Sequence, residues 1–111
     1  MKLAIIGSRD LHEENLDDYL PNNVTEIVSG GARGIDSDAA DFARNRGIKL
    51  TVFLPEYARY KRGAPIVRNK RIVDYTDEVL VFWDGRSRGT LNVIDYCRKV
   101  GKRVTVVTKD D

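Results

Sequence analysis

Short apolar runs alternate with segments of helical periodicity along this chain. Five runs have the length and apolar character of strands that are covered on both faces of a sheet, and they lie at 3–6, 25–28, 49–54, 78–82 and 103–107. Apolar positions at helical spacing predict helices between these runs, at 12–20, at 37–46, from Pro65 onward and at 91–100. This alternation of strand and helix predicts a parallel α/β sheet with right-handed crossovers.

The apolar content of each run indicates its place in the sheet. The first and fourth runs are the most uniformly apolar, whereas the third and fifth carry a central threonine, Thr51 or Thr105. Central strands are buried on both faces, so the first and fourth runs belong in the middle of the sheet and the third and fifth at its edges. We therefore expect a three-layer Rossmann-like α/β domain spanning residues 1–111, with a five-stranded parallel sheet of order 3-2-1-4-5 and helices on both faces. The flavodoxin-like order 2-1-3-4-5 agrees less well with this pattern.

Three turns of similar composition follow strands 1, 2 and 4. In the order 3-2-1-4-5 these turns are neighbours at the edge where ligands of open α/β sheets bind. They lie at 7–10, 29–36 and 84–90, and each contains glycine, a small hydroxyl residue and arginine. Glycine lets backbone N–H groups approach an anion closely, and arginine fits phosphate. The sequence therefore predicts one pocket for a phosphorylated ligand, with close packing of strand and helix as the other explanation of the glycines in 29–36.

Specific groups in these turns are suited to hold an anion. The backbone N–H groups expected to hold phosphate oxygens are those of Gly31, Arg33, Gly89 and Thr90. The side chains expected to neutralise or bind the anion are Arg9, Arg33, Arg88, Arg68 and Asn69. Arg86 is interpreted as a solvated surface charge.

Several polar and aromatic residues have two interpretations. Asp36 and Thr90 each suit the N-cap of the helix that follows, while Asp36 and Asp10 also suit ribose hydroxyls or a base edge. The aromatic residues near the turns are expected to pack or to stack on a base, and they are Tyr57, Tyr60 and Trp83. Cys97 is expected to be a small core residue.

Composition describes an ordinary globular chain. Its 111 residues are 41% hydrophobic and 32% charged, with a net charge of +2. The single cysteine excludes an internal disulfide, and no metal-ligand spacing is present, so neither a metal nor a cofactor is predicted. The first apolar run ends at Gly7 and is too short for a secretion signal, and no apolar run is long enough to span a membrane. We therefore expect a cytoplasmic protein with no membrane partner.

Signals for catalysis are weak. The serines of the three turns, Ser8, Ser29 and Ser87, have no nearby general base in the sequence, and His12 is expected to lie on the surface. The stretch 29–36 lacks the Lys-Ser/Thr ending of a P-loop.

Four ordered motifs resemble those of the SLOG superfamily, which includes DprA-like DNA-processing proteins and LOG-type nucleotide proteins. They are 7–9 (GSR), 29–36 (SGGARGID), 68–69 (RN) and 85–90 (GRSRGT). Their spacing is most similar to the small stand-alone YspA-like (YpsA-related) branch, and the resemblance covers 3–107. It implies a Rossmann-like fold whose pocket binds nucleotides, nucleotide derivatives or nucleic acid, and it is compatible with a homodimer. The motif matches and the three turns together define the candidate ligand-binding residues, which are Gly7, Ser8, Arg9, Ser29, Gly30, Gly31, Ala32, Arg33, Gly34, Asp36, Arg68, Asn69, Ser87, Arg88, Gly89 and Thr90.

The expected function is binding of a nucleotide-derived phosphorylated ligand, as a sensor or carrier. LOG-type phosphoribohydrolases are similar but carry a catalytic glutamate where this chain has Val93, which argues against that hydrolysis. Single-stranded DNA binding, as in DprA-like proteins, is an alternative that the basic stretch 59–71 favours. A hydrolase of N-glycosidic or phosphate bonds is a further alternative, and it would require Asp10, Asp36 or Asp84 as the acid or base.

Overall fold

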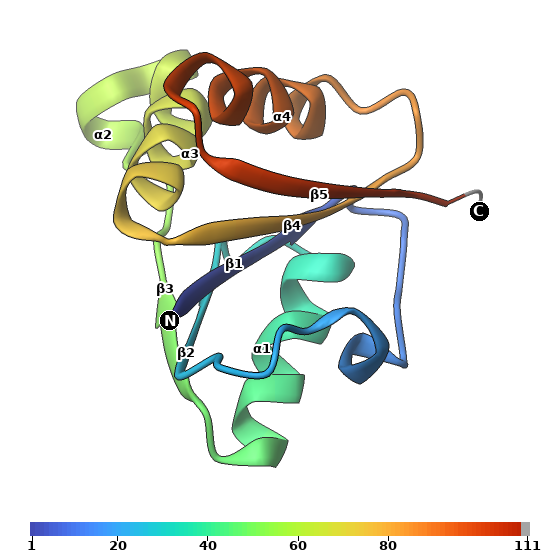
Figure 1. Cartoon of the computed structure of the whole chain (residues 1–111). Helices are drawn as coiled ribbons and strands as arrows, with labels where there is room; N and C mark the ends of the chain where they lie inside the picture. Colours follow the sequence, from blue (N-terminus) through green and yellow to red (C-terminus); the bar gives the residue numbers. More distant parts are fainter. Residues whose placement is uncertain (110–111) are drawn as a thin grey trace.

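The central element is a five-stranded parallel sheet in the order β3-β2-β1-β4-β5 (Figure 1). A computed structural model of the chain describes residues 1–109. Its strands are β1 (Lys2–Gly7), β2 (Glu26–Ser29), β3 (Lys49–Val52), β4 (Glu78–Trp83) and β5 (Arg103–Thr108). The predicted order is confirmed, and β3 and β5, which carry the central threonines, are the edge strands.

Helices cover both faces of the sheet. Figure 1 shows α1 on one face and α3 and α4 on the other, with α2 beside α3. The helices are η1 (Leu16–Tyr19), α1 (Ile35–Arg46), α2 (Tyr57–Tyr60), η2 (Lys61–Gly63), α3 (Ala64–Tyr75) and α4 (Arg88–Val100), where η marks a 3₁₀ turn. None of the helices within residues 1–109 combines the length and apolar character needed to cross a bilayer.

Two buried clusters hold the layers together. In β1, Leu3 and Ile5 pack toward α1, whereas Ala4 and Ile6 pack toward α3 and α4. All four side chains are nearly inaccessible to solvent, which explains why the strand reads as a continuous apolar run rather than an alternating one. Full burial of a side chain such as Ile5 stabilises the fold by about 1.5–3 kcal/mol.

The predicted helix at 12–20 is wrong in extent, because the described chain has only the 3₁₀ turn η1 there. Polar side chains compete for the backbone before it: the N–H of Glu13 donates to Asp38 at 2.9 Å, and the N–H of Asn15 donates to the Glu13 carboxylate at 3.0 Å. The segment is held instead by the buried side chains of Leu11 and Leu16.

Candidate functional site

A cavity of about 440 Å³ opens at the carboxyl ends of β1, β2 and β4, where the three turns meet. Twelve of the sixteen candidate residues line it, namely Gly7, Ser8, Arg9, Gly30, Ala32, Arg33, Asp36, Arg68, Asn69, Ser87, Gly89 and Thr90. The remaining four, Ser29, Gly31, Gly34 and Arg88, are not part of its lining, whereas Arg86 is. Of these two neighbouring arginines, Arg86, interpreted from the sequence as a surface charge, lines the cavity, whereas ligand binding by Arg88 stays a prediction.

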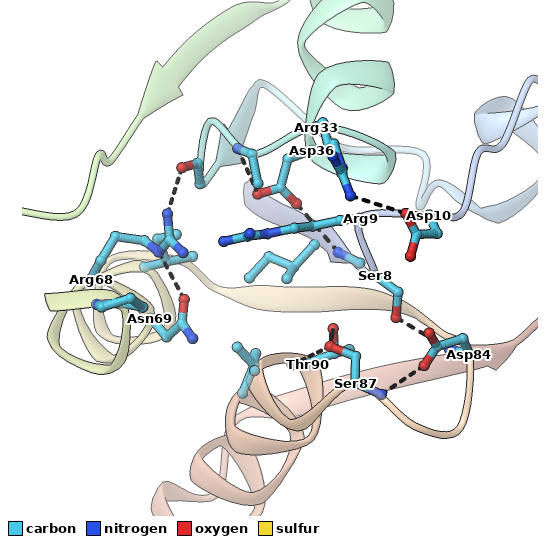
Figure 2. Close-up of a pocket in the computed structure, with 18 of the residues that line it drawn as sticks. Ser8, Arg9, Asp10, Arg33, Asp36, Arg68, Asn69, Asp84, Ser87 and Thr90 are labelled. Carbon is cyan, nitrogen blue, oxygen red and sulfur yellow. Dashed lines mark hydrogen bonds and ion pairs between the residues drawn. The ribbon is translucent and has the colours of Figure 1, made fainter. Parts of the chain in front are cut away.

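The turn after β1 is fixed at both ends. The N–H of Ser8 donates to the carbonyl of Phe82 in β4 at 3.1 Å, and its hydroxyl accepts from the N–H of Asp84 at 3.3 Å (Figure 2). These bonds join the ends of β1 and β4 next to the cavity. They leave the exposed side chain of Arg9 to project from a rigid base.

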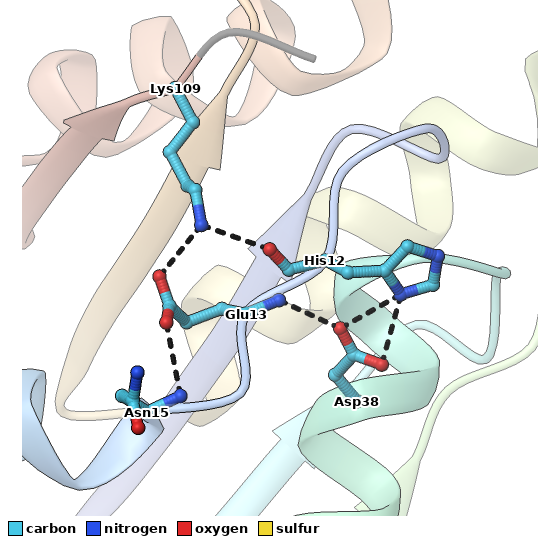
Figure 3. A network of polar contacts seen from close by, with 5 residues as sticks. All are labelled: His12, Glu13, Asn15, Asp38 and Lys109. Atoms are coloured by element: carbon cyan, nitrogen blue, oxygen red, sulfur yellow. Dashed lines mark hydrogen bonds and ion pairs between the residues drawn. The ribbon is translucent and has the colours of Figure 1, made fainter.

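A polar network anchors the continuation of this turn (Figure 3). The Lys109 ammonium donates to the Glu13 carboxylate at 2.8 Å and to the carbonyl of His12 at 2.9 Å. The hydrogen bond from Lys109 is the main cause that lowers the pKa of Glu13 below its usual value. On the other side, the exposed His12 ring lies 3.0 Å from Asp38 of α1. The loop that carries Arg9 is thus tied to α1 and to Lys109, the residue after β5.

The turn after β2 is closed by its own carboxylate. Asp36 is buried, and its oxygens accept hydrogen bonds from the N–H groups of Gly7 and Ala32, both at 3.3 Å. Burial raises the pKa of Asp36, while these backbone hydrogen bonds and the nearby charge of Arg68 oppose the rise. The Gly31 N–H donates to the Ser29 hydroxyl at 3.3 Å and is therefore already partnered. Asp36 is not the N-cap of α1, because Gly34 occupies that position.

Packing explains several of the glycines. A Cβ on Gly7 would lie 2.5 Å from the Ile35 side chain, and one on Gly34 would lie 2.4 Å from the carbonyl oxygen of Arg9. Gly34 also has φ +77°, which side chains rarely tolerate. Close packing, the alternative that the sequence left open for the glycines of 29–36, therefore accounts for Gly34, and it also explains Gly7. Gly89 differs, because a Cβ there would meet no atom within 4 Å.

The turn after β4 presents the start of α4 to the cavity. The Asp84 carboxylate accepts from the N–H groups of Arg86 and Ser87, both at 2.8 Å, and these two bonds lower the pKa of Asp84. The Ser87 hydroxyl then accepts from the N–H of Thr90 at 3.4 Å, so Ser87 rather than Thr90 is the N-cap. Because of this cap, α4 begins three residues before the predicted position.

The first turn of α4 retains donors for a ligand. Within residues 1–109, no hydrogen bond uses the N–H groups of Arg88 and Gly89, which are the first two of the helix. They carry the positive end of the helix dipole. Gly89, without a side chain, leaves this end of the helix open to the cavity.

Two arginines face each other above the cavity. Arg68 of α3 is half-buried, with Nη1 donating to the Gly30 carbonyl at 2.6 Å and Nε donating to Asn69 at 2.8 Å. Figure 2 shows the Arg9 guanidinium stretched across the cavity toward Arg68. Burial lowers the pKa of Arg68 most, and the charge of Arg9 lowers it further, while the charge of Asp36 opposes both. Arg9 forms no hydrogen bond or salt bridge with any of residues 1–109.

The third arginine is already neutralised. Arg33 lies 3.3 Å from the Asp10 carboxylate, and both side chains are mostly exposed, so the pair contributes little to stability. The carboxylates at the cavity are therefore engaged, Asp10 by Arg33, Asp84 by two backbone amides and Asp36 by the amides of two turns.

Sequence reasoning missed the apolar floor of the cavity. Ile6, Ile72 and Val93 line it, and each also belongs to the core. The local pattern identifies these side chains as core but cannot show that one face of them borders a cavity. It likewise missed Asp84 as the residue that shapes the turn before α4, although Asp followed by Gly is a recognised turn signal.

Comparison with known proteins identifies the family of this chain and a structure with the same fold. The model of the YspA, cpYpsA-related SLOG family matches residues 1–60, which include the first two turns. Among solved structures, DNA processing protein A (DprA) from Streptococcus pneumoniae superposes with a TM-score of 0.78 at 21% sequence identity. The match covers 98% of this chain and 50% of that one, so this chain corresponds to about half of its structural neighbour. No curated protein matches the sequence. The chain belongs to the YspA, cpYpsA-related SLOG family.

Proposed function

We propose that this cavity binds a nucleotide or a nucleotide-derived phosphorylated ligand, and that the protein acts as a sensor or carrier of it. The observation that carries the proposal is the pair of arginines, Arg9 and Arg68, which approach each other across the cavity. Two like charges in a partly desolvated site repel each other, and an anion between them removes this repulsion. Arg9 has no carboxylate partner that would do so within the described chain.

The start of α4 supplies the second half of the proposed anion-binding site, which we call the anion seat. The N–H groups of Arg88 and Gly89 have no partner within the described residues, and the helix dipole favours negative charge at this end. A phosphate group would thus accept charge-assisted hydrogen bonds from the arginines and neutral ones from the helix. A cavity of about 440 Å³ is within the usual range for small-molecule sites.

Binding without hydrolysis is the function that the lining favours. Val93 is buried in the floor, at the position where the similar phosphoribohydrolases carry their glutamate. The carboxylates that could replace it are engaged elsewhere, since Asp84 accepts two backbone amides, Asp36 holds two turns together and Asp10 is paired with Arg33. A general acid or base must reach the reacting group, and Asp84 and Asp36 are not available without breaking the turns.

Calorimetric titration with AMP and ADP tests the proposal. The Arg9→Ala variant is expected to bind either nucleotide about tenfold more weakly, because a hydrogen bond between charged groups contributes about 1.5–3 kcal/mol. Arg44→Ala is the matched control, because Arg44 is an exposed arginine of α1 paired with Asp41 and lies outside the cavity. The proposal would be refuted if the unaltered protein bound neither AMP nor ADP nor their dinucleotide forms.

Single-stranded nucleic acid is the second candidate ligand. Exposed basic residues follow one another on α2 and η2, namely Arg59, Lys61 and Arg62, and the structural neighbour DprA is a DNA processing protein. Contacts to a nucleic-acid backbone predict affinity that falls steeply as salt rises. Fluorescence anisotropy with a labelled oligonucleotide at two salt concentrations measures this, and Lys61→Ala should reduce the salt slope. No binding at low salt would exclude this candidate.

A further inference from the structure

A second, smaller hollow adjoins the cavity. This side groove, of about 300 Å³, is lined by Pro55, Tyr57 and Gly31 and shares its other residues with the cavity, namely Arg9, Gly30, Ala32, Arg33 and Arg68. Leu54, which is 63% exposed, lies next to Gly31. Arg9 and Arg68 therefore border both hollows, and the side groove adds a proline and a tyrosine to its lining.

The tyrosine of this side groove differs from the other four in the chain. Tyr19 packs edge-on against Phe82, Tyr60 lies under Arg59, Tyr75 packs against Phe53 and donates to Glu26, and Tyr96 donates to Asp74. Tyr57 is 55% exposed, and its ring and hydroxyl make no hydrogen bond or ring contact with any of residues 1–109. Its backbone carbonyl accepts a hydrogen bond from the N–H of Lys61, so only the side chain is left open.

The other aromatic residues near the site are already engaged. The Trp83 indole N–H donates to the Ser87 carbonyl at 3.1 Å, which fixes the ring against the turn that precedes α4. Arg59 lies over the Tyr60 ring at 5.2 Å and occupies that face. Of the three aromatic residues that the sequence suggested for stacking, Tyr57 is therefore the one with an open face, and it lines the side groove.

We propose that the side groove is a base subsite, in which a planar aromatic base of the ligand stacks on Tyr57 while its phosphate lies between Arg9 and Arg68. This inference rests on the proposed function of the cavity and specifies the ligand class as one in which an aromatic base is joined to a phosphate through a sugar. Stacking on an aromatic ring is tolerant of base identity, since every base presents a π-face. Arg9 and Arg68 border both hollows, so a ligand whose phosphate lies between them can place its base in the side groove.

Titrations with AMP and with ribose 5-phosphate, which lacks the base, test this assignment. Tyr57→Ala is expected to weaken AMP binding about tenfold, in line with the effect of removing one base–aromatic stack, and to leave ribose 5-phosphate binding within about twofold. Tyr57→Phe keeps the ring and should bind AMP as the unaltered protein does. Tyr60→Ala, from the same short helix, is the matched control and should have no effect on either ligand.

The outcomes separate the two levels of the proposal. AMP binding that Tyr57→Ala leaves unchanged, while Arg9→Ala weakens both ligands, would overturn the base subsite and leave the anion seat intact. Equal weakening of both ligands by Tyr57→Ala would also overturn it, because the tyrosine would then act on the phosphate through Arg68. Failure of the unaltered protein to bind AMP would overturn the base subsite, and failure to bind ADP and the dinucleotide forms as well would refute the proposed function.

Discussion

Gly89→Ala should raise the stability of this protein while it weakens ligand binding. Gly89 is the second residue of α4, its φ lies outside the left-handed region, and a methyl group on it would meet no atom within 4 Å. Alanine is a better helix former than glycine by about 0.5–1 kcal/mol, and the lower value applies near a helix end. An unfolding entropy of about 2.1 cal/mol/K per residue gives about 0.23 kcal/mol/K for 111 residues, so Tm should rise by about 2 °C.

The same methyl group would project into the cavity. It would occupy space beside the N–H groups of Arg88 and Gly89, which are the donors proposed for phosphate. A phosphate held farther from these donors loses hydrogen bonds that depend steeply on distance. We expect AMP to bind about tenfold more weakly, which corresponds to about 1.4 kcal/mol.

Thermal unfolding and calorimetric titration with AMP measure the two effects on one sample. Asp95→Ala is the matched control, because Asp95 is exposed on the same helix, outside the cavity, and also gains helix propensity when changed to alanine. This control should raise Tm without altering AMP affinity. A lower Tm for Gly89→Ala, or AMP affinity equal to that of the unaltered protein, would refute the reasoning.

Three further expectations concern the fold. Gly34→Ala should lower the free energy of unfolding in urea by at least about 2 kcal/mol, because φ of Gly34 is +77° and the Arg9 carbonyl oxygen lies 2.4 Å from the added Cβ. A smaller loss would show that the turn can relax. Burial acts to raise the pKa of Glu26, but hydrogen bonds from Tyr75 and Thr51 and the charge of Lys49 bring it below its usual value. The ionised form therefore stabilises the fold above about pH 4.3, and this contribution is lost on acidification. Glu26→Gln should therefore lower stability at pH 7 and flatten its loss between about pH 5 and 3, and a parallel pH curve would contradict this. Burial raises the pKa of the Cys97 thiol to about 11, so a thiol reagent at neutral pH should modify the unfolded chain much faster than the folded one, and equal rates would be inconsistent with this burial.

The sheet could be predicted because its order depends on properties that each strand carries by itself. Burial on both faces produces uniform apolar runs in β1 and β4, and partial exposure permits Thr51 and Thr105 in β3 and β5. Once the order is known, the meeting of three turns at one edge follows from parallel topology alone.

The roles of individual turn residues could not be predicted, because they depend on contacts between segments distant in sequence. A side chain at Gly7 would collide with Ile35, and one at Gly34 would collide with the Arg9 carbonyl. Each of these partners lies in the other turn, so the pattern within one turn does not reveal it. The cap of α4 was misassigned for a local reason, since both Ser87 and Thr90 are suitable hydroxyl residues and only the backbone at Asp84 decides between them.

The turn after β2 shows how the chain itself limits where a ligand's charge can lie. Its amides were expected to hold phosphate, but Asp36 already accepts from Gly7 and Ala32, and Ser29 already accepts from Gly31. An anion that replaced the Asp36 carboxylate would release two turns at once, so we expect the external anion to use donors outside these bonds, among them the first turn of α4 and the arginine pair. In this arrangement the Asp36 carboxylate draws the ends of β1 and β2 together and so brings Arg9 toward Arg68. Asp36, which lies in the loop predicted to bind phosphate, thereby helps to build the proposed anion seat beside that loop.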